Sequence, residues 1–180
     1  NKVSEIGSFA FYRAYNVKTR NLPSTLSSIG EGAFALTDRT LRINENNKYF
    51  VFESGCLRGK DKKDLYFGNR KAVINHTVNH ILPYAFYGNT GLNSLILPDS
   101  VETIGESAFA HSFLSSLVIP SSVRSMDSMA FAECERLADI TYQGTKAEWN
   151  QIDFGDSVFS SIPAENVICK DFVFDLIEEN

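Results

Sequence analysis

The chain has 180 residues, and its 43% hydrophobic and 22% charged residues are typical of a globular domain with a sizeable core rather than of a disordered chain. Its formal net charge of −5 and pI near 5.2 argue against a nucleic-acid or anionic-membrane surface, because either would need a basic patch. No apolar run approaches the roughly 18 residues that a membrane-spanning helix needs.

A repeat runs through most of the chain. The pair Ala-Phe recurs, and its phenylalanines lie 23, 52, 23 and 22 residues apart. Five residues before each Phe stands an isoleucine or methionine, and three residues earlier stands another aliphatic residue. One such unit cannot bury its apolar face alone, so the units must stack into a solenoid. The five phenylalanines are Phe11, Phe34, Phe86, Phe109 and Phe131.

Each unit also carries a strand-like run. In Leu95-x-Leu97-Pro98 and Leu117-x-Ile119-Pro120 the alternation predicts a short strand with one buried face, which proline ends because it has no N–H to donate. Stacking should place these strands in a parallel sheet and the phenylalanines in a ladder through the core. Gly7, Gly30 and Gly105 fit sharp bends or close contacts between coils. The residue three positions after each Phe is mostly small and polar, which suits capping of turn backbone.

The 52-residue gap indicates a longer repeat with an insertion at about 44–70. The segments Tyr49–Glu53 and Leu65–Phe67 are strand-like, and Ser54-Gly55 and Gly59–Asp61 have the composition of turns. We therefore expect an inserted β-hairpin, after which the repeat resumes at Ile74.

After Tyr142 we expect the repeats to stop and a cap to begin. Thr145, with Glu148 three residues later, predicts the start of a short helix, and Asn166–Cys169 could add a final strand. The predicted organisation is a solenoid over 1–145 and a continuous C-terminal cap over 146–180. Because Asn1 falls inside a repeat, we expect that the native chain carries more sequence upstream. The apolar residues available to cover the last coil are Trp149, Ile152, Phe154, Val158 and Phe159.

The repeat resembles the BspA-type leucine-rich repeats of bacterial cell-surface proteins, whose unit is close to L-x-x-I-x-I-P-x-S-V-x-x-I-G-x-x-A-F. The stretch Leu95 to Phe109 fits it nearly position by position, and Leu117 to Val123 fits its first part. The insertion resembles the longer repeat of this family, and 144–150 resembles a common closing segment. The resemblance implies a right-handed leucine-rich repeat solenoid of short parallel β-strands, turns and short helical segments.

The same resemblance implies a non-enzymatic function. Family members are secreted or surface-attached and adhere to host proteins or other cells, with protein partners such as extracellular-matrix or other cell-surface proteins. They share no catalytic residues, so the resemblance implies no catalytic site, no cofactor and no metal. Two alternatives remain open at this point: a structural spacer that presents other domains of a longer chain, and a glycan-binding module.

Few residues indicate chemistry. His76 and His80 have the spacing of two ligands on one helical face, but the repeat places both at exposed turn and strand positions, so no metal site is predicted. His111 lies beside Ser112 and near Glu106, yet every coil has a similar polar turn there. Cys56, Cys134 and Cys169 show no Cys-x-x-Cys spacing, and we expect them to be reduced and mostly buried.

One surface is a candidate for binding. Between the two buried residues of each strand lies an outward residue, and stacking should align these residues as one column on the exposed face of the sheet. Three of them are apolar and would form a stripe of the kind that can mark a binding surface, although β-branched residues also suit an open sheet. The column consists of Asn21, Arg42, Val73, Ile96, Val118 and Thr141.

Overall fold

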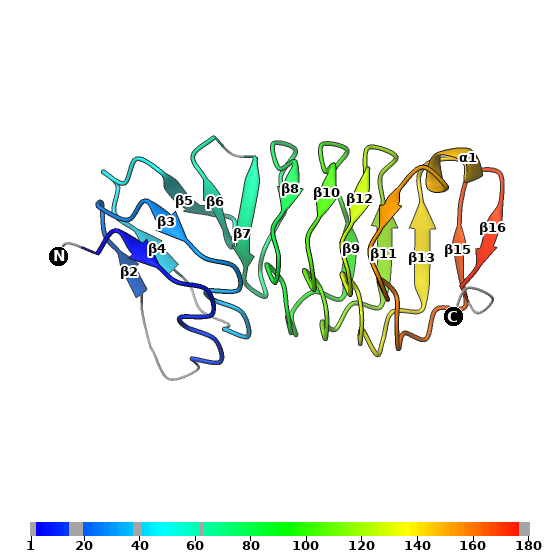
Figure 1. The fold of residues 1–180 in the computed structure, drawn as a ribbon, viewed down its shortest axis with the longest axis horizontal. Helices are drawn as coiled ribbons and strands as arrows, with labels where there is room; N and C mark the ends of the chain where they lie inside the picture. Colours follow the sequence, from blue (N-terminus) through cyan, green and yellow to red (C-terminus); the bar gives the residue numbers. More distant parts are fainter. Residues whose placement is uncertain (1–2, 15–19, 38–40, 62, 177–180) are drawn as a thin grey trace.

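The computed structural model describes residues 3–14, 20–37, 41–61 and 63–176, which form an elongated β-solenoid with coils stacked along its length (Figure 1). Two strand series run along the solenoid on opposite sides. One series forms a seven-stranded sheet in the order β14-β12-β10-β8-β7-β6-β5, and the other a five-stranded sheet in the order β16-β15-β13-β11-β9. Two further pairs, β1-β3 and β2-β4, continue the two sides toward the N-terminus.

The strands are short because each coil contributes only a few residues to each side. The first series comprises β14 (Asp153–Phe154), β12 (Ser125–Met126), β10 (Thr103–Ile104), β8 (His80–Ile81), β7 (Asp64–Gly68), β6 (Cys56–Gly59) and β5 (Phe50–Glu53). The second comprises β16 (Val173–Asp175), β15 (Asn166–Ile168), β13 (Asp139–Tyr142), β11 (Ser116–Ile119) and β9 (Ser94–Ile96). The N-terminal pairs are β1 (Glu5–Ile6) with β3 (Ser28–Ile29), and β2 (Arg20–Leu22) with β4 (Leu41–Ile43).

The Ala-Phe segments form turns whose backbone hydrogen bonds alternate in direction. In the fourth turn, the amides of Ala108 and Ala110 donate to carbonyls three residues earlier in the same turn, whereas those of Phe109 and His111 donate to the next coil. The residues two positions before and two after each Phe have positive φ angles, as Ser107 at 51° and His111 at 56° show. An α-helix does not allow this conformation, so turns replace most of the expected helical segments.

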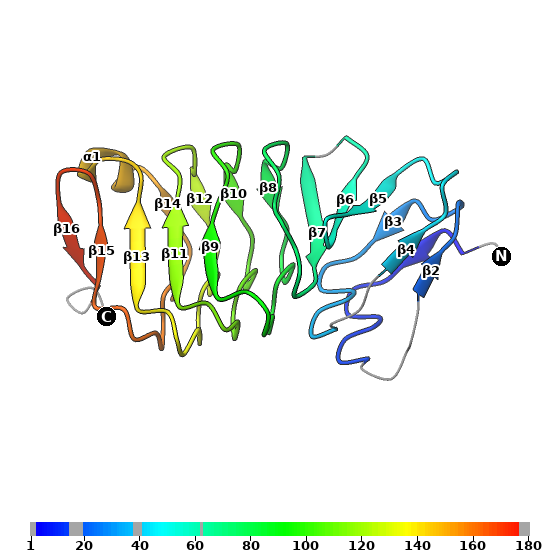
Figure 2. The same ribbon diagram turned by 180° about the vertical axis from the view of Figure 1, so that it is seen from behind.

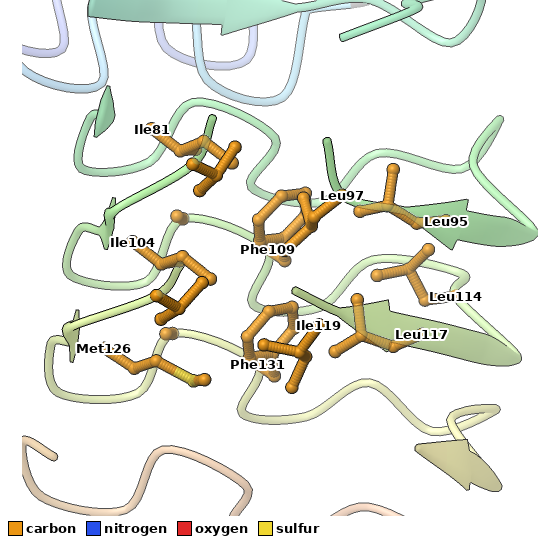
Figure 3. Packing of buried hydrophobic residues seen from close by; sticks show 14 of the residues in the cluster. Ile81, Leu95, Leu97, Ile104, Phe109, Leu114, Leu117, Ile119, Met126 and Phe131 are labelled. Atoms are coloured by element: carbon orange, nitrogen blue, oxygen red, sulfur yellow. The ribbon is translucent and has the colours of Figure 1, made fainter. Parts of the chain in front are cut away.

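The predicted ladder is present in part: Phe86, Phe109 and Phe131 stack on one another, and the last two are labelled in Figure 3, whereas Phe34 stacks on Phe11 and not on Phe86. The rings of Phe86, Phe109 and Phe131 lie with successive centroids 4.9 and 5.0 Å apart and with interplanar angles of 4°. Aliphatic residues from both strand series enclose the ladder, so each coil buries its apolar residues only against the coils beside it. This arrangement is the physical reason for the spacing of the repeat.

The insertion is the predicted hairpin with one additional strand. Strands β5 and β6 pair antiparallel through a turn at Ser54 and Gly55, whose φ angles of 48° and 78° are those that a tight two-residue hairpin favours. Strand β6 pairs antiparallel with β7, and β7 then pairs parallel with β8. The insertion therefore extends the sheet of β8 to β14 by three strands, whereas the strand pairs of the first coils remain separate sheets.

The repeats do not stop at Tyr142, contrary to the prediction. Strand β14 pairs with β12, β15 pairs with β13, and the ring of Phe159 stacks on Phe131 at 5.6 Å. A sixth turn with Val158-Phe159 in place of Ala-Phe therefore continues the solenoid. The predicted final strand is present as β15, and β16 pairs antiparallel with it. The domain boundary at 145 stays a prediction.

The predicted helix start is present as α1 (Lys146–Trp149), the only helix among the residues that the structure describes. The Thr145 hydroxyl accepts a hydrogen bond from the Glu148 amide, and the Glu148 carboxylate accepts one from the Thr145 amide at 2.8 Å. The three cysteines are free and buried, as expected. Burial raises the pKa of the Cys56 thiol to about 11, so this thiol is an unreactive core residue.

Candidate binding surface

The exposed face of the five-stranded sheet carries a row of aligned side chains, which we call the sheet row. In the strand register Val118 lies between Ile96 and Thr141, Thr141 lies beside Ile168, and Ile168 lies beside Val173. Ile96 is 68% exposed, Ile168 51% and Val173 52%, whereas Val118 and Thr141 are half-buried. The sheet row is Ile96, Val118, Thr141, Ile168 and Val173, and its strands face the viewer in Figure 2.

The six residues predicted from the sequence do not form one column. Asn21 and Arg42 are neighbours in the separate β2-β4 pair, and both are exposed. Val73 is exposed but lies outside any strand, because its amide donates to the Ser54 carbonyl of the insertion instead of joining β9. Only Ile96, Val118 and Thr141 share the predicted alignment, because the insertion interrupts the strand series between β4 and β9.

Sequence reasoning missed two members of the sheet row. Ile168 had a usable signal, because the strand expected over Asn166–Cys169 has Val167 buried and therefore turns Ile168 outward. The sequence gives no such signal for Val173, because β16 lies outside the repeat and its antiparallel pairing with β15 cannot be inferred from the repeat pattern.

A polar row runs beside the sheet row. Ser94, Ser116 and Asp139 are aligned in the register, and the Ser116 hydroxyl donates to the Ser94 hydroxyl at 2.8 Å. Asn166 and Asp175 are paired in the same way on the last two strands. The face therefore presents an apolar centre with a polar edge, which is the usual composition of a protein interface.

The residues that drew attention as possible catalysts or ligands lie apart from this face. His80 is in β8, where its Nδ1 lies 3.0 Å from the Thr103 hydroxyl, and His76 lies in the preceding turn. Ser112 is buried with its hydroxyl 3.3 Å from the Cys134 sulfur, whereas His111 is exposed. Over the described parts of the chain, no group of three or more His, Cys, Asp or Glu side chains could hold a metal ion.

The fold and its repeat define a leucine-rich repeat protein. The chain belongs to the BspA-type leucine-rich repeat family, whose model matches residues 1–70 and 65–176 in six copies. No curated protein matches the chain. No helix in the described ranges is long and apolar enough to cross a membrane.

Two solved structures share the fold. The pneumococcal vaccine antigen PcpA is 24% identical with a TM-score of 0.82, over 94% of this chain and 43% of that one. A leucine-rich repeat protein from Eubacterium ventriosum is 17% identical with a TM-score of 0.51, over 91% of this chain and 63% of that one. The chain thus spans less than two thirds of the length of either structure.

Proposed function

We propose that the chain is a non-enzymatic protein-interaction module of a secreted or cell-surface bacterial protein, acting in adhesion to host or microbial macromolecules. The observation that carries this proposal is the sheet row, in which four apolar residues and one threonine are aligned across five strands. Ile96, Ile168 and Val173 are each more than half exposed, and extended exposed apolar surface is typical of protein interaction sites. Membership of a repeat family that serves protein interaction supports the same function.

The flat geometry favours many modest contacts over one deep pocket. Neighbouring strands lie about 4.8 Å apart, so the five residues span about 19 Å, which is comparable to one edge of a standard interface. A partner that covers the sheet row would desolvate Ile96, Ile168 and Val173 together. Their substitution should therefore weaken the complex more than substitution of any single residue at the polar edge.

The test begins with the chain as bait for extracellular-matrix and mucosal proteins, followed by affinity measurement with each purified partner. We expect Ile96→Lys combined with Val118→Lys to weaken binding at least tenfold, because each lysine places a charge in the apolar centre. The control is Met129→Lys, which changes an exposed apolar residue on a turn outside the sheet row. Unchanged affinity of the folded double variant would remove the sheet row as the binding surface and favour a spacer role.

A further inference from the structure

A second surface, on the turn side of the solenoid, gathers five aromatic rings from three different coils. We call it the aromatic patch, and its turns lie along the lower edge of the solenoid in Figure 1. The ring centroids of Phe9 and Tyr84 lie 4.9 Å apart, those of Tyr84 and Tyr87 5.7 Å, and those of Tyr12 and Tyr87 6.5 Å. The patch consists of Phe9, Tyr12, Tyr84, Tyr87 and His111.

The patch exists because the long repeat has no Ala-Phe turn. The second and third turns are therefore in direct contact, and the Leu36 amide donates to the Tyr87 carbonyl at 3.4 Å across 51 residues of sequence. The second turn carries Gly32 and Ala35 at the two positions where the first carries Phe9 and Tyr12. The Phe9 ring lies against Gly32, where a side chain would collide with it, and so reaches Tyr84 of the third turn.

The turns themselves do not require aromatic residues at these positions. The fourth turn has Ser107 and Ala110 there, and the sixth has Ser157 and Ser160, with the same positive φ angle at the first position. Phe9 and Tyr84 adopt that angle although a bulky side chain makes it unfavourable. The backbone conformation of the turns therefore does not explain why these positions are aromatic.

Much of the patch stays in contact with solvent. Phe9 is 43% exposed and Tyr12 37%, whereas the ladder phenylalanines of the same turns are more deeply buried. Beside Tyr87 lies an open cavity of about 320 Å³, whose wall also includes the polar residues Arg70, Asn89 and Thr90. An aromatic surface next to a cavity with a few polar groups has the composition of a small-ligand site.

Two carboxylates and one guanidinium lie at the patch, since the Cζ atom of Arg13 is 5.4 Å from the centroid of the Tyr12 ring. The Tyr84 hydroxyl donates to the Glu106 carboxylate at 3.0 Å, and Glu31 is close enough to act on the same phenol. Burial and the Glu106 hydrogen bond raise the pKa of Tyr84 above its usual value of 10. Carboxylates accept hydrogen bonds from neutral hydroxyl groups and a guanidinium donates them, so both kinds of group can bind the hydroxyls of an uncharged ligand.

We propose that the aromatic patch binds neutral oligosaccharides. The apolar face of a pyranose ring presents C–H groups with partial positive charge, which are attracted to the negative face of an aromatic ring, while the sugar hydroxyls donate to carboxylates such as Glu31 and Glu106. The site is distinct from the sheet row and does not depend on the protein-binding function proposed above.

The test titrates the folded chain with neutral hexasaccharides of glucose, galactose, mannose or N-acetylglucosamine, using calorimetry and saturation-transfer NMR. We expect at least one to bind and Tyr12→Ala to weaken that binding at least fivefold. Tyr12 is suited to the test because it is exposed on the first turn, and a thermal melt verifies folding. Phe9→Leu, which keeps an apolar side chain but removes the ring, should also weaken binding.

The matched control is Phe113→Ala, which removes a 40% exposed aromatic ring that pairs with Arg136 outside the patch. This variant and Ile96→Lys should bind the hexasaccharide like the parent. A proline-rich decapeptide is the competing probe, because such peptides also dock on aromatic surfaces. The proposal is overturned if no hexasaccharide binds, if only the peptide binds, or if Tyr12→Ala and Phe113→Ala weaken binding equally.

Discussion

At the scale of single residues, the glycines four positions before the phenylalanines show how closely the coils approach. A Cβ atom on Gly105 would lie 2.7 Å from the Pro83 nitrogen and 3.0 Å from the Leu82 carbonyl carbon of the preceding coil. A Cβ atom on Gly30 or Gly155 would likewise lie within 3.0 Å of backbone atoms of the preceding coil. Gly7 has no atom within 4 Å at this position, because no described coil precedes it.

This difference gives a prediction with an internal control. Gly105→Ala should lower the free energy of unfolding by about 1–3 kcal/mol, because the methyl group must displace backbone rather than a flexible side chain. Gly7→Ala should be neutral or stabilise by up to about 1 kcal/mol, since alanine only restricts the unfolded chain. Urea denaturation of both variants measures the effect. Equal destabilisation by the two substitutions would contradict the close approach of the coils.

At the scale of elements, the sequence predicted those whose pattern is local or repeated. The alternation in Leu95-x-Leu97 and the capping pair Thr145 and Glu148 identified β9 and the start of α1, because both signals lie within a few residues. It did not predict β6, whose four residues are all buried and lack alternation, or β14, whose coil has Val158-Phe159 instead of Ala-Phe. The sequence did not predict the aromatic patch either. Its residues come from turns that are in contact only because the long repeat has no Ala-Phe turn.

The capping pair gives a pH-dependent prediction. Hydrogen bonds from the backbone and side chain of Thr145 hold the pKa of Glu148 below its usual value of 4.5. The ionised carboxylate therefore stabilises the fold above about pH 4.5, and this contribution is lost as the pH falls through the lower folded-state pKa. In thermal melts, Glu148→Gln should melt below the parent at pH 6, and the difference should shrink toward pH 3. A difference independent of pH would show that the charge does not contribute.

At the scale of the whole molecule, the solenoid has two hydrophobic clusters of unequal size. Thirty buried residues of the described chain form the larger cluster, from the insertion to β15, and ten form the smaller one around Phe34. The Phe ladder continues from Phe86 to Phe159, whereas Phe34 stacks on Phe11 and meets Phe67 at a tilt of 52°. In a solenoid each coil is stabilised mainly by its neighbours, so stability should follow the size of the local cluster.

This asymmetry predicts that the N-terminal coils open first. In native-state hydrogen exchange, the amides of Ala33 and Ala35 should exchange faster than those of Ala108 and Ala110, although all four are hydrogen-bonded to backbone carbonyls. Phe109→Ala should cost about 3–5 kcal/mol and reduce protection throughout the larger cluster, since it removes the middle of the ladder. Phe34→Ala removes an equally buried ring but should reduce protection only in the first coils. If instead both variants reduced protection uniformly along the chain, the two clusters would unfold as one cooperative unit and the ladder would transmit stability across the insertion.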